Sequence, residues 1–419
     1  MDASNRRQFL QSLGLATASG CLPPDASGQE TKQVMPPDLP RDLKPTNANL
    51  GSLFPDVSRL AEANRYQYSF LGDRFKTLDE FKRESRAKAF DVLLYKPEKV
   101  DPKPEVVDRV DCGDFIREKV VFSTSPLFRV PAYVLIPKGL KKPAPGIVDL
   151  HSHGGMYIFG KEKVVDLGGN HPVMVDYHAR NYDSRPTATA LVRRGYVVIT
   201  IDAFFFGERR LIMDVDHKYG WDRTKYSRED VAALNLKCRG KEDTISKALI
   251  YAGLCWPGIV FWDDIRTVDY LVTRPEVDPK RLGCLGILMG GWRTSFLAGL
   301  DERIGAACAV GFMSTVKAMI QEKIDTHSWV HFVPHLHPYL DLPDVISMMA
   351  PKPLMVQQCN QDRLFTLDGM KESVEKIATV YAKAGVKDKF QGRFYDAPHT
   401  FNKTMQDEAF EWFDKVLKG

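Results

Sequence analysis

Residues 281–291 read RLGCLGILMGG, an apolar run that ends in closely spaced glycines. The first part, Arg281–Ile287, predicts a strand that is buried on both faces. Glycine relieves the crowding of a tight turn, and it occurs here at Gly286, Gly290 and Gly291. The next residues predict a helix, because apolar side chains recur at helical spacing at Trp292, Phe296 and Leu300. A strand, a glycine-rich turn and a helix in this order are the context of a nucleophile elbow, G-x-S-x-G.

The third position of this elbow pattern, where the nucleophile belongs, is Leu288. Leucine has no proton to release and no lone pair with which to attack a carbonyl carbon. The glycine spacing is a weak signal when it stands alone. The functional interpretation therefore depends on residues elsewhere in the chain.

Short apolar runs alternate with helix-like stretches in the later part of the chain. The predicted strands are 146–150, 196–202, 281–287, 304–310, 353–358 and 389–395. The predicted helices are 187–194, 262–272, 291–300, 367–384 and 404–417. Fully apolar strands that alternate with helices indicate an α/β fold with a mostly parallel central sheet and helices on both faces. Catalytic groups in such a sheet lie beyond the carboxyl ends of the strands.

The region before this alternation has a different pattern. The sequence Thr77-Leu78-Asp79-Glu80 is a capping box that predicts a helix to about Tyr95, so 56–100 is expected to be a helical preface. Three strand-like runs follow and predict antiparallel strands: 106–110, 115–123 and 130–136. Two long insertions follow later strands and are expected to overhang the active-site edge: 204–258 and 311–350.

An acid and a histidine follow two of the predicted parallel strands. Asp362 lies just after 353–358, and His399 lies just after 389–395. The chain order of elbow, acid and histidine is that of the catalytic triad in α/β-hydrolases. In an intact triad the histidine accepts the serine proton, and the aspartate fixes the imidazole tautomer. We therefore predict that the side chains of Leu288, Asp362 and His399 converge.

These residues and several longer motifs resemble a bacterial α/β-hydrolase family related to acetyl xylan esterases and dienelactone hydrolases. The resemblance covers most of residues 60–417. It is carried by LHSHGGMYIFGKEK (150–163), IDAFFFGERR (201–210), the segment 261–291, APKPLMVQQCNQDRLF (350–365) and APHTF (397–401). The resemblance implies an α/β-hydrolase fold and the hydrolysis of acyl esters, with carbohydrate esters as substrates and serine expected at Leu288.

The resemblance also implies the roles of individual residues. Asp362 and His399 would be the other triad members, and the Met289 N–H would be one oxyanion donor. The second donor would come from the backbone around His153 and Gly154. We expect no cofactor and no metal, with small-molecule or oligosaccharide esters as partners.

Leu288 is the departure from the family pattern that matters most for activity. Removal of the triad nucleophile lowers turnover by about 10⁶ in a serine protease, and about 10³–10⁴ over water remains. No neighbouring side chain replaces it, because Ser295 lies two turns along the predicted helix and Cys284 lies inside the predicted strand. We therefore expect the chain to be inactive or strongly impaired as an esterase.

Two other functions remain open on the sequence. A non-catalytic ester- or glycan-binding lipoprotein would keep the pocket, Asp362 and His399 while hydrolysis is lost. A metal-assisted hydrolase would use the His151/His153 pair, and His327 and His331 have a spacing that suits zinc if their segment is helical. We favour the interpretation that the HSHGG segment shapes the oxyanion loop.

Aromatic and charged side chains of the first insertion suit a sugar-sized cleft. The candidate substrate-binding residues are Arg209, Arg210 and Trp221, and either arginine would pair with a substrate carboxylate. The alternative is that FFFGERR (204–210) packs the insertion onto the sheet.

Composition excludes several other classes of protein. Of 419 residues, 58 are Lys or Arg and 54 are Asp or Glu, a net charge of +4 that is too balanced for an electrostatic nucleic-acid binder. No run of 18 apolar residues is present, which argues against an internal membrane span. The seven cysteines contain no CxxC pair, so neither a zinc finger nor a disulfide framework is indicated.

The N-terminus predicts export. Residues 4–21 read SNRRQFLQSLGLATASGC, in which Arg6 and Arg7 precede a mildly apolar stretch, as in twin-arginine signals. The end of this stretch resembles a lipoprotein cleavage box, with Cys21 as the lipidated residue. Residues 22–55 form a Pro-rich tether, and 56–419 form the hydrolase domain. We expect a periplasmic or cell-envelope location; the alternative for 1–21 is an amphipathic helix.

Overall fold

The computed structural model describes residues 45–219 and 222–419. The predicted signal at 1–21, Cys21, most of the tether and Trp221 lie outside these residues. Within the described ranges no single helix is long and apolar enough to cross a membrane. One bent pair, Arg228–Tyr251 with Trp256–Leu271, meets that test only when its two halves are counted together.

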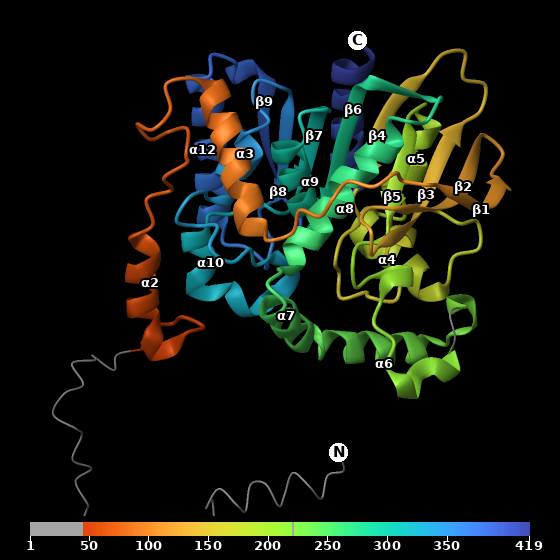
Figure 1. Cartoon of the computed structure of the whole chain (residues 1–419), viewed down its shortest axis with the longest axis horizontal. Helices are drawn as coiled ribbons and strands as arrows, with labels where there is room; N and C mark the ends of the chain where they lie inside the picture. The colour runs from red at the N-terminus through yellow and green to blue at the C-terminus, as the bar shows by residue number, and fades with distance from the viewer. Residues whose placement is uncertain (1–44, 220–221) are drawn as a thin grey trace, which may run out of the picture. The chain divides into compact units, whose positions relative to one another are not determined.

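A nine-stranded sheet forms the centre of the domain, in the order β1-β2-β3-β5-β4-β6-β7-β8-β9 (Figure 1). The first three strands pair antiparallel with one another, and β3 pairs antiparallel with β5. Every pair from β5 through β9 is parallel. The strands are β1 Glu105–Asp111, β2 Phe115–Ser123, β3 Arg129–Pro137, β4 Ala144–Asp149, β5 Val197–Ile201, β6 Val277–Ile287, β7 Ile304–Val310, β8 Leu354–Cys359 and β9 Phe390–Tyr395. The predicted antiparallel run followed by a parallel sheet is confirmed.

Helices cover both faces of the sheet, and the strands explain why. Successive residues of a strand point to opposite faces, so a strand that is apolar throughout presents an apolar surface on each side. In β4, Ile147 belongs to one hydrophobic cluster and Val148 to the other. The cluster of Val148 includes buried residues of α3, α8, α9, α11 and α12, and the cluster of Ile147 includes those of α4, α5 and α13.

The longer helices have the following bounds: α2 Phe54–Glu62, α3 Leu78–Leu93, α4 Pro172–Tyr182, α5 Thr187–Arg193, α6 Arg228–Arg239, α7 Glu242–Tyr251, α8 Trp256–Leu271, α9 Met289–Leu300, α10 Val316–Glu322, α11 Leu342–Ser347, α12 Leu367–Lys383 and α13 Lys403–Phe413. The predicted capping box opens α3, where the Thr77 side chain accepts a hydrogen bond from the Glu80 N–H at 3.2 Å. The helix α8 begins earlier than predicted, because Pro257 stands in its first turn, where proline is favoured.

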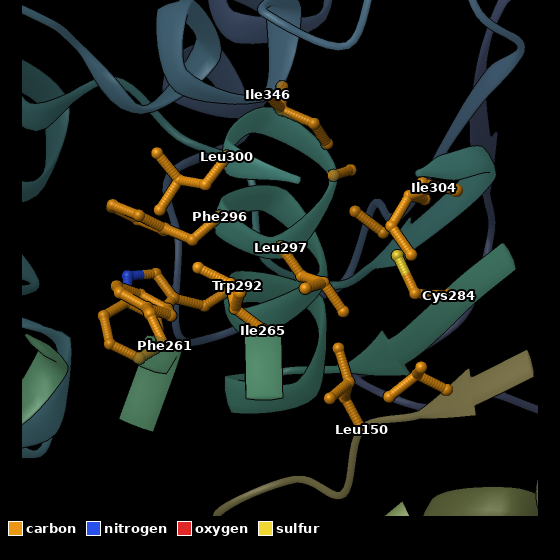
Figure 2. Packing of buried hydrophobic residues seen from close by; sticks show 14 of the residues in the cluster. Leu150, Phe261, Ile265, Cys284, Trp292, Phe296, Leu297, Leu300, Ile304 and Ile346 are labelled. Carbon is orange, nitrogen blue, oxygen red and sulfur yellow. The ribbon is translucent and has the colours of Figure 1, made fainter. Parts of the chain in front are cut away.

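The helix α9 is buried along its whole length, and it places the elbow at one edge of the sheet. Figure 2 shows Trp292, Phe296 and Leu300 along one side of α9 and Leu297 on the side toward Cys284. The rings of Phe261 and Phe296 stack with 3.9 Å between their centroids. Arg293 and Asp264 add a fully buried ion pair with an Nε–Oδ2 distance of 3.0 Å. Aromatic packing and ion pairing therefore hold α9 against α8.

The two insertions carry their own helices. Figure 1 shows α6 and α7 of the first insertion beyond one end of the strands. The second insertion contains α10, two short 3₁₀ turns and α11. Glu242, the first residue of α7, accepts a hydrogen bond of 2.7 Å from the hydroxyl group of Ser328 in the second insertion. The insertions therefore meet over the edge where the parallel strands end.

Six cysteines of the described residues are unpaired: Cys112, Cys238, Cys255, Cys284, Cys308 and Cys359.

Candidate active site

The elbow has the backbone geometry of a sharp strand-to-helix turn. Leu288 connects β6 to α9 with φ +55° and ψ −120°, a conformation that L residues rarely adopt and that costs about 1–3 kcal/mol. The glycines around it are required by close backbone contacts. A Cβ on Gly290 would lie 1.9 Å from the Leu150 carbonyl oxygen, and a Cβ on Gly286 would lie 2.3 Å from the same atom. The strain at position 288 is therefore that of a nucleophile elbow, although the side chain is leucine.

Asp362 and His399 form a hydrogen-bonded pair at the same edge of the sheet. Asp362 follows β8 and His399 follows β9, so their parallel strands bring them side by side. His399 Nδ1 lies 2.6 Å from Asp362 Oδ2, and the aspartate side chain is fully buried. The other carboxylate oxygen, Oδ1, accepts the Leu364 N–H at 2.8 Å. Because the carboxylate can only accept, Nδ1 carries the proton, and Nε2 is left as the basic nitrogen.

Leu288 and His399 line one cavity of about 460 Å³. The loop after β4 contributes His153, Gly154 and Gly155 to the same cavity, and the second insertion contributes residues 325–329 and His331. The exposed rim of this cavity is mostly polar and includes Arg239, Asp243, Asp325, Thr326 and Trp329. Two predicted triad positions, Leu288 and His399, thus meet at the cavity, and His399 is bonded to the third, Asp362. At the nucleophile position the side chain is the apolar Leu288.

The residues that the sequence predicts as oxyanion donors lie at the start of α9 and in the loop after β4. Met289 is the first residue of α9, where helix geometry leaves N–H groups without intrahelical partners. In the loop, Gly154 has φ +56°, and a Cβ there would lie 2.4 Å from Tyr177 Oη. Lys163 Nζ donates to the carbonyl oxygens of Ser152 at 2.7 Å and His153 at 3.0 Å. Burial holds the pKa of Lys163 well below its ordinary value.

Glu242 of α7 fixes this loop from the other side, and sequence reasoning missed it. Its Oε1 accepts hydrogen bonds from His153 Nε2 at 3.0 Å, Tyr157 Oη at 2.6 Å and Ser328 Oγ at 2.7 Å. Burial raises the pKa of Glu242, but the hydrogen bonds, led by that of His153, outweigh it and leave the pKa below its ordinary value. Glu242 therefore connects the loop after β4 to the second insertion.

His153 takes part in this network as a neutral side chain. Its Nδ1 accepts the Gly155 N–H at 3.0 Å, so Nε2 carries the proton that is donated to Glu242. Burial lowers the pKa of His153 despite the nearby carboxylate. The contact is thus a charge-assisted hydrogen bond from a neutral imidazole rather than an ion pair.

The geometry does not support the His151/His153 pair as metal ligands. The ring of His151 is buried, with Nδ1 2.9 Å from the Ser152 carbonyl oxygen and Nε2 accepting the Ala203 N–H at 3.1 Å. Both nitrogens of His153 are likewise used within the protein. His327 and His331 do line the cavity, with ring centroids 5.6 Å apart, but they lie in and beside short 3₁₀ turns and not on one helix.

One acidic cluster among the described residues has metal-like spacing: Glu162, Asp202 and Glu208. Its centre is taken by Lys161, whose Nζ lies 2.7 Å from Asp202 and 2.6 Å from Glu208. Arg223 adds a second cation, 2.7 Å from Glu162. The carboxylates are therefore compensated by basic side chains of the chain itself.

The two arginines predicted to bind substrate are not among the residues that line the cavity. Arg209 Nη1 pairs with Asp263 Oδ2 at 2.7 Å, and Arg210 donates to the Gly207 carbonyl and to Tyr226 Oη, each at 3.0 Å. These contacts hold the start of the first insertion against α8 and against other residues of the insertion itself. Phe205 and Phe206 are buried beside them, as the packing alternative predicts for this segment.

Comparison with known proteins adds a family and a curated relative. A family model described as "Abhydrolase family" matches residues 55–406. The protein named "Putative hydrolase YtaP" of Bacillus subtilis (strain 168) is 25% identical over 337 residues, which are 80% of this chain and 99% of that protein.

Two solved structures share the fold at low identity. A "putative acetyl xylan esterase" of Bacteroides fragilis NCTC 9343 has a TM-score of 0.60 and 18% identity, with 81% of each chain covered. A glucuronoyl esterase of Solibacter usitatus has a TM-score of 0.56 and 16% identity, with 80% of this chain and 92% of that chain covered.

Proposed function

The chain belongs to the Abhydrolase family, and from that membership we propose that it is a serine-type carboxylic-ester hydrolase whose covalent route is blocked by Leu288. Its substrates are acyl esters of carbohydrates. The observation that carries the proposal is the 2.6 Å hydrogen bond between His399 and Asp362 at the cavity lined by Leu288.

The chemistry of the cavity supports an ester substrate. A carbonyl group between His399 and the first turn of α9 would place its oxygen near the Met289 N–H and the loop at His153 and Gly154. With serine at position 288, His399 Nε2 would accept the hydroxyl proton, and the oxygen would attack the carbonyl carbon to give an acyl-enzyme. Water would then release the acid, with His399 again acting as base.

Leucine at position 288 removes the first of these steps. No oxygen is present to attack, and the branched side chain fills part of the space between His399 and the oxyanion donors. His399 can then act only on a water molecule directly, without the covalent intermediate. Since binding groups are retained, an ester or a glycan would still be bound, and this makes the non-catalytic binding protein the alternative function of the same cavity.

Two observations support carbohydrate esters as the class of substrate. The rim of the cavity has hydrogen-bonding side chains beside the exposed ring of Trp329, a combination that suits sugars. In addition, two proteins of the same fold are named as an acetyl xylan esterase and a glucuronoyl esterase.

We also propose that the chain is exported and tethered at the cell envelope through a lipid on Cys21. The support is the paired Arg6 and Arg7 and the apolar stretch that leads to Cys21. Cell fractionation with mass spectrometry of the mature N-terminus tests this: we expect a chain that begins at a lipidated Cys21. A cytoplasmic chain with residues 1–20 intact would contradict it.

Hydrolysis of p-nitrophenyl acetate by three proteins tests the proposed enzyme. The unchanged chain should give negligible turnover, and Leu288→Ser should raise kcat/KM by about 10³ or more. His399→Ala in the Leu288→Ser background should abolish the gain. Robust hydrolysis by the unchanged chain that His399→Ala does not affect would contradict the mechanism.

A further inference from the structure

Two histidines of the second insertion have buried ring nitrogens without protein partners. His327 Nε2 and both ring nitrogens of His331 have no hydrogen-bond partner of good geometry among the described residues. Both side chains line the cavity that contains Leu288 and His399. A buried polar atom left unsatisfied costs about 1–3 kcal/mol, so such atoms in a cavity indicate the place where a ligand, or water in its absence, completes them.

The tautomer of His327 is fixed by its backbone contact. His327 Nδ1 lies 2.8 Å from the Lys323 carbonyl oxygen, which can only accept, so Nδ1 carries the proton. Burial lowers the pKa of His327, and the ring is therefore neutral near pH 7. Its Nε2 is then a bare acceptor, which requires a ligand group that can donate a hydrogen bond.

The ring of His331 is held by aromatic packing. Its ring stacks on Phe312 with a centroid distance of 4.9 Å and meets the edge of Trp292 at 5.2 Å. Burial, with His327 and His153 nearby, holds the pKa of His331 well below its ordinary value. A neutral imidazole has one donor and one acceptor, so His331 can complement a group that both gives and takes hydrogen bonds.

The two rings lie next to each other, with 5.6 Å between their centroids, in the wall of the cavity that contains Leu288 and His399. The ring of His327 is 5.0 Å from that of Phe365, in the loop that carries Asp362. His331 contacts the ring of Trp292, whose backbone N–H donates to the Leu288 carbonyl oxygen at 2.9 Å. A ligand bound to both histidines would therefore lie next to the position of the scissile ester.

The donor and acceptor pattern selects the class of ligand group. A hydroxyl group can donate to His327 Nε2 and can also exchange hydrogen bonds with His331. An ionised carboxylate or phosphate has no proton to donate, and it would lie beside a neutral acceptor instead of a cation. An unsubstituted acyl chain would leave all three nitrogens without partners.

We propose that His327 and His331 form a subsite that binds free hydroxyl groups on the alcohol part of an ester, next to the scissile bond. The subsite rests on the proposed function and specifies its substrate as an ester of a polyhydroxylated alcohol, such as a partly acylated sugar. It distinguishes such esters from aryl or alkyl esters, which have no hydroxyl group there.

Calorimetric titration of the unchanged chain tests the subsite, because negligible turnover leaves the ester intact during the measurement. The probe is mono-O-acetyl xylotriose, and fully acetylated xylotriose is the comparison without free hydroxyl groups. His327→Phe and His331→Phe keep the aromatic packing, and each should raise the Kd of the mono-acetylated probe about five- to tenfold. Binding of the fully acetylated probe should be weak and unchanged. His335→Asn is the control, since His335 is exposed on the same insertion and does not line the cavity.

A second measurement does not depend on the variants. In nitrogen-detected imidazole NMR spectra of the unchanged chain, the mono-acetylated probe should shift the resonances of His327 and His331 and leave His335 in place. Absence of binding, equal affinity for the two probes, or resonances that do not move would overturn the subsite. Failure of the proposed function would appear separately, as a lack of p-nitrophenyl acetate hydrolysis by Leu288→Ser, and it would not alter the binding results.

Discussion

His153 and Glu242 are joined by a hydrogen bond of 3.0 Å between Nε2 and Oε1, although 89 residues separate them in the chain. The same carboxylate oxygen accepts hydrogen bonds from Tyr157 and Ser328. One buried glutamate of the first insertion therefore fixes the loop after β4 and the edge of the second insertion. In the proposed mechanism, a loop held in this way does not need to reorganise when charge develops on the substrate oxygen.

Replacement of Glu242 should lower both the stability of the protein and its kcat, because this carboxylate holds the loop after β4 in place. Glu242→Ala leaves His153, Tyr157 and Ser328 without their acceptor, so we expect a loss of about 2–5 kcal/mol in the free energy of unfolding. In the Leu288→Ser background it should also lower kcat on p-nitrophenyl acetate by about tenfold or more, with a smaller change in KM.

Asp243→Ala is the matched control for this prediction. Asp243 lines the same cavity, but its side chain is half exposed and pairs with Lys247 at 2.8 Å on the helix surface. Urea denaturation and initial rates should show little change in stability or kcat for this variant. Equal effects of the two alanine variants would argue against a positioning role for Glu242.

The stability of the protein should fall as pH rises, because the buried carboxyl group of Asp149, at the end of β4, loses its proton. Burial raises the pKa of its carboxyl group from 3.8 to about 7, although Thr187 donates a hydrogen bond of 2.6 Å to it. Because the folded state binds this proton more tightly than the unfolded state, its contribution to stability is present below about pH 4 and is lost as pH rises to about 7. The loss is on the order of 4 kcal/mol.

Asp149→Asn tests this assignment, because the amide oxygen can still accept the Thr187 hydroxyl. The free energy of unfolding, measured by urea denaturation between pH 5 and 8, should fall less steeply with pH for the variant than for the unchanged chain. The variant should be the more stable of the two at pH 8. Parallel pH profiles would show that Asp149 does not carry this proton.

The elbow should not tolerate a side chain at Gly290. Gly290→Ala would place a methyl group 1.9 Å from the Leu150 carbonyl oxygen in a backbone that is packed on all sides. We expect a loss of at least about 3 kcal/mol in thermal or urea denaturation, as for other overpacked cores. Gly169→Ala is the control, since no atom lies within 4 Å of its added Cβ, and it should unfold like the unchanged chain.

The parallel sheet was predictable because its strands are short, fully apolar and separated by helices. The strand at 304–310 has the predicted bounds as β7, and the strand at 115–123 has those of β2. The helices of the insertions give a weaker signal for a physical reason. In α7 the buried side chains are the polar Glu242 and Ser246, while Ile245 and Leu249 are only partly buried, so the apolar face of the helix is short. The C-terminal helix ends at Phe413, earlier than predicted, and a π-helical turn continues it from Asp414 to Lys418.

The site was predictable to the extent that its residues follow strands. Leu288, Asp362 and His399 each lie just beyond the carboxyl end of a parallel strand, and strand order alone brings such positions to one edge. Glu242 and Lys163 could not be found in the same way. Their partners are set by how the insertion and the loop after β4 pack, and no local spacing in the sequence encodes those contacts.

Active-site labelling tests the central claim about Leu288 most directly. An alkyl fluorophosphonate forms a stable phosphonyl adduct only with a serine that is activated by a base beside an oxyanion hole. Intact-protein and peptide mass spectrometry should show no adduct on the unchanged chain. Leu288→Ser should gain a single adduct at position 288, and that adduct should disappear in the double variant with His399→Ala. An adduct elsewhere on the unchanged chain, or a folded Leu288→Ser protein that stays unlabelled, would contradict the account.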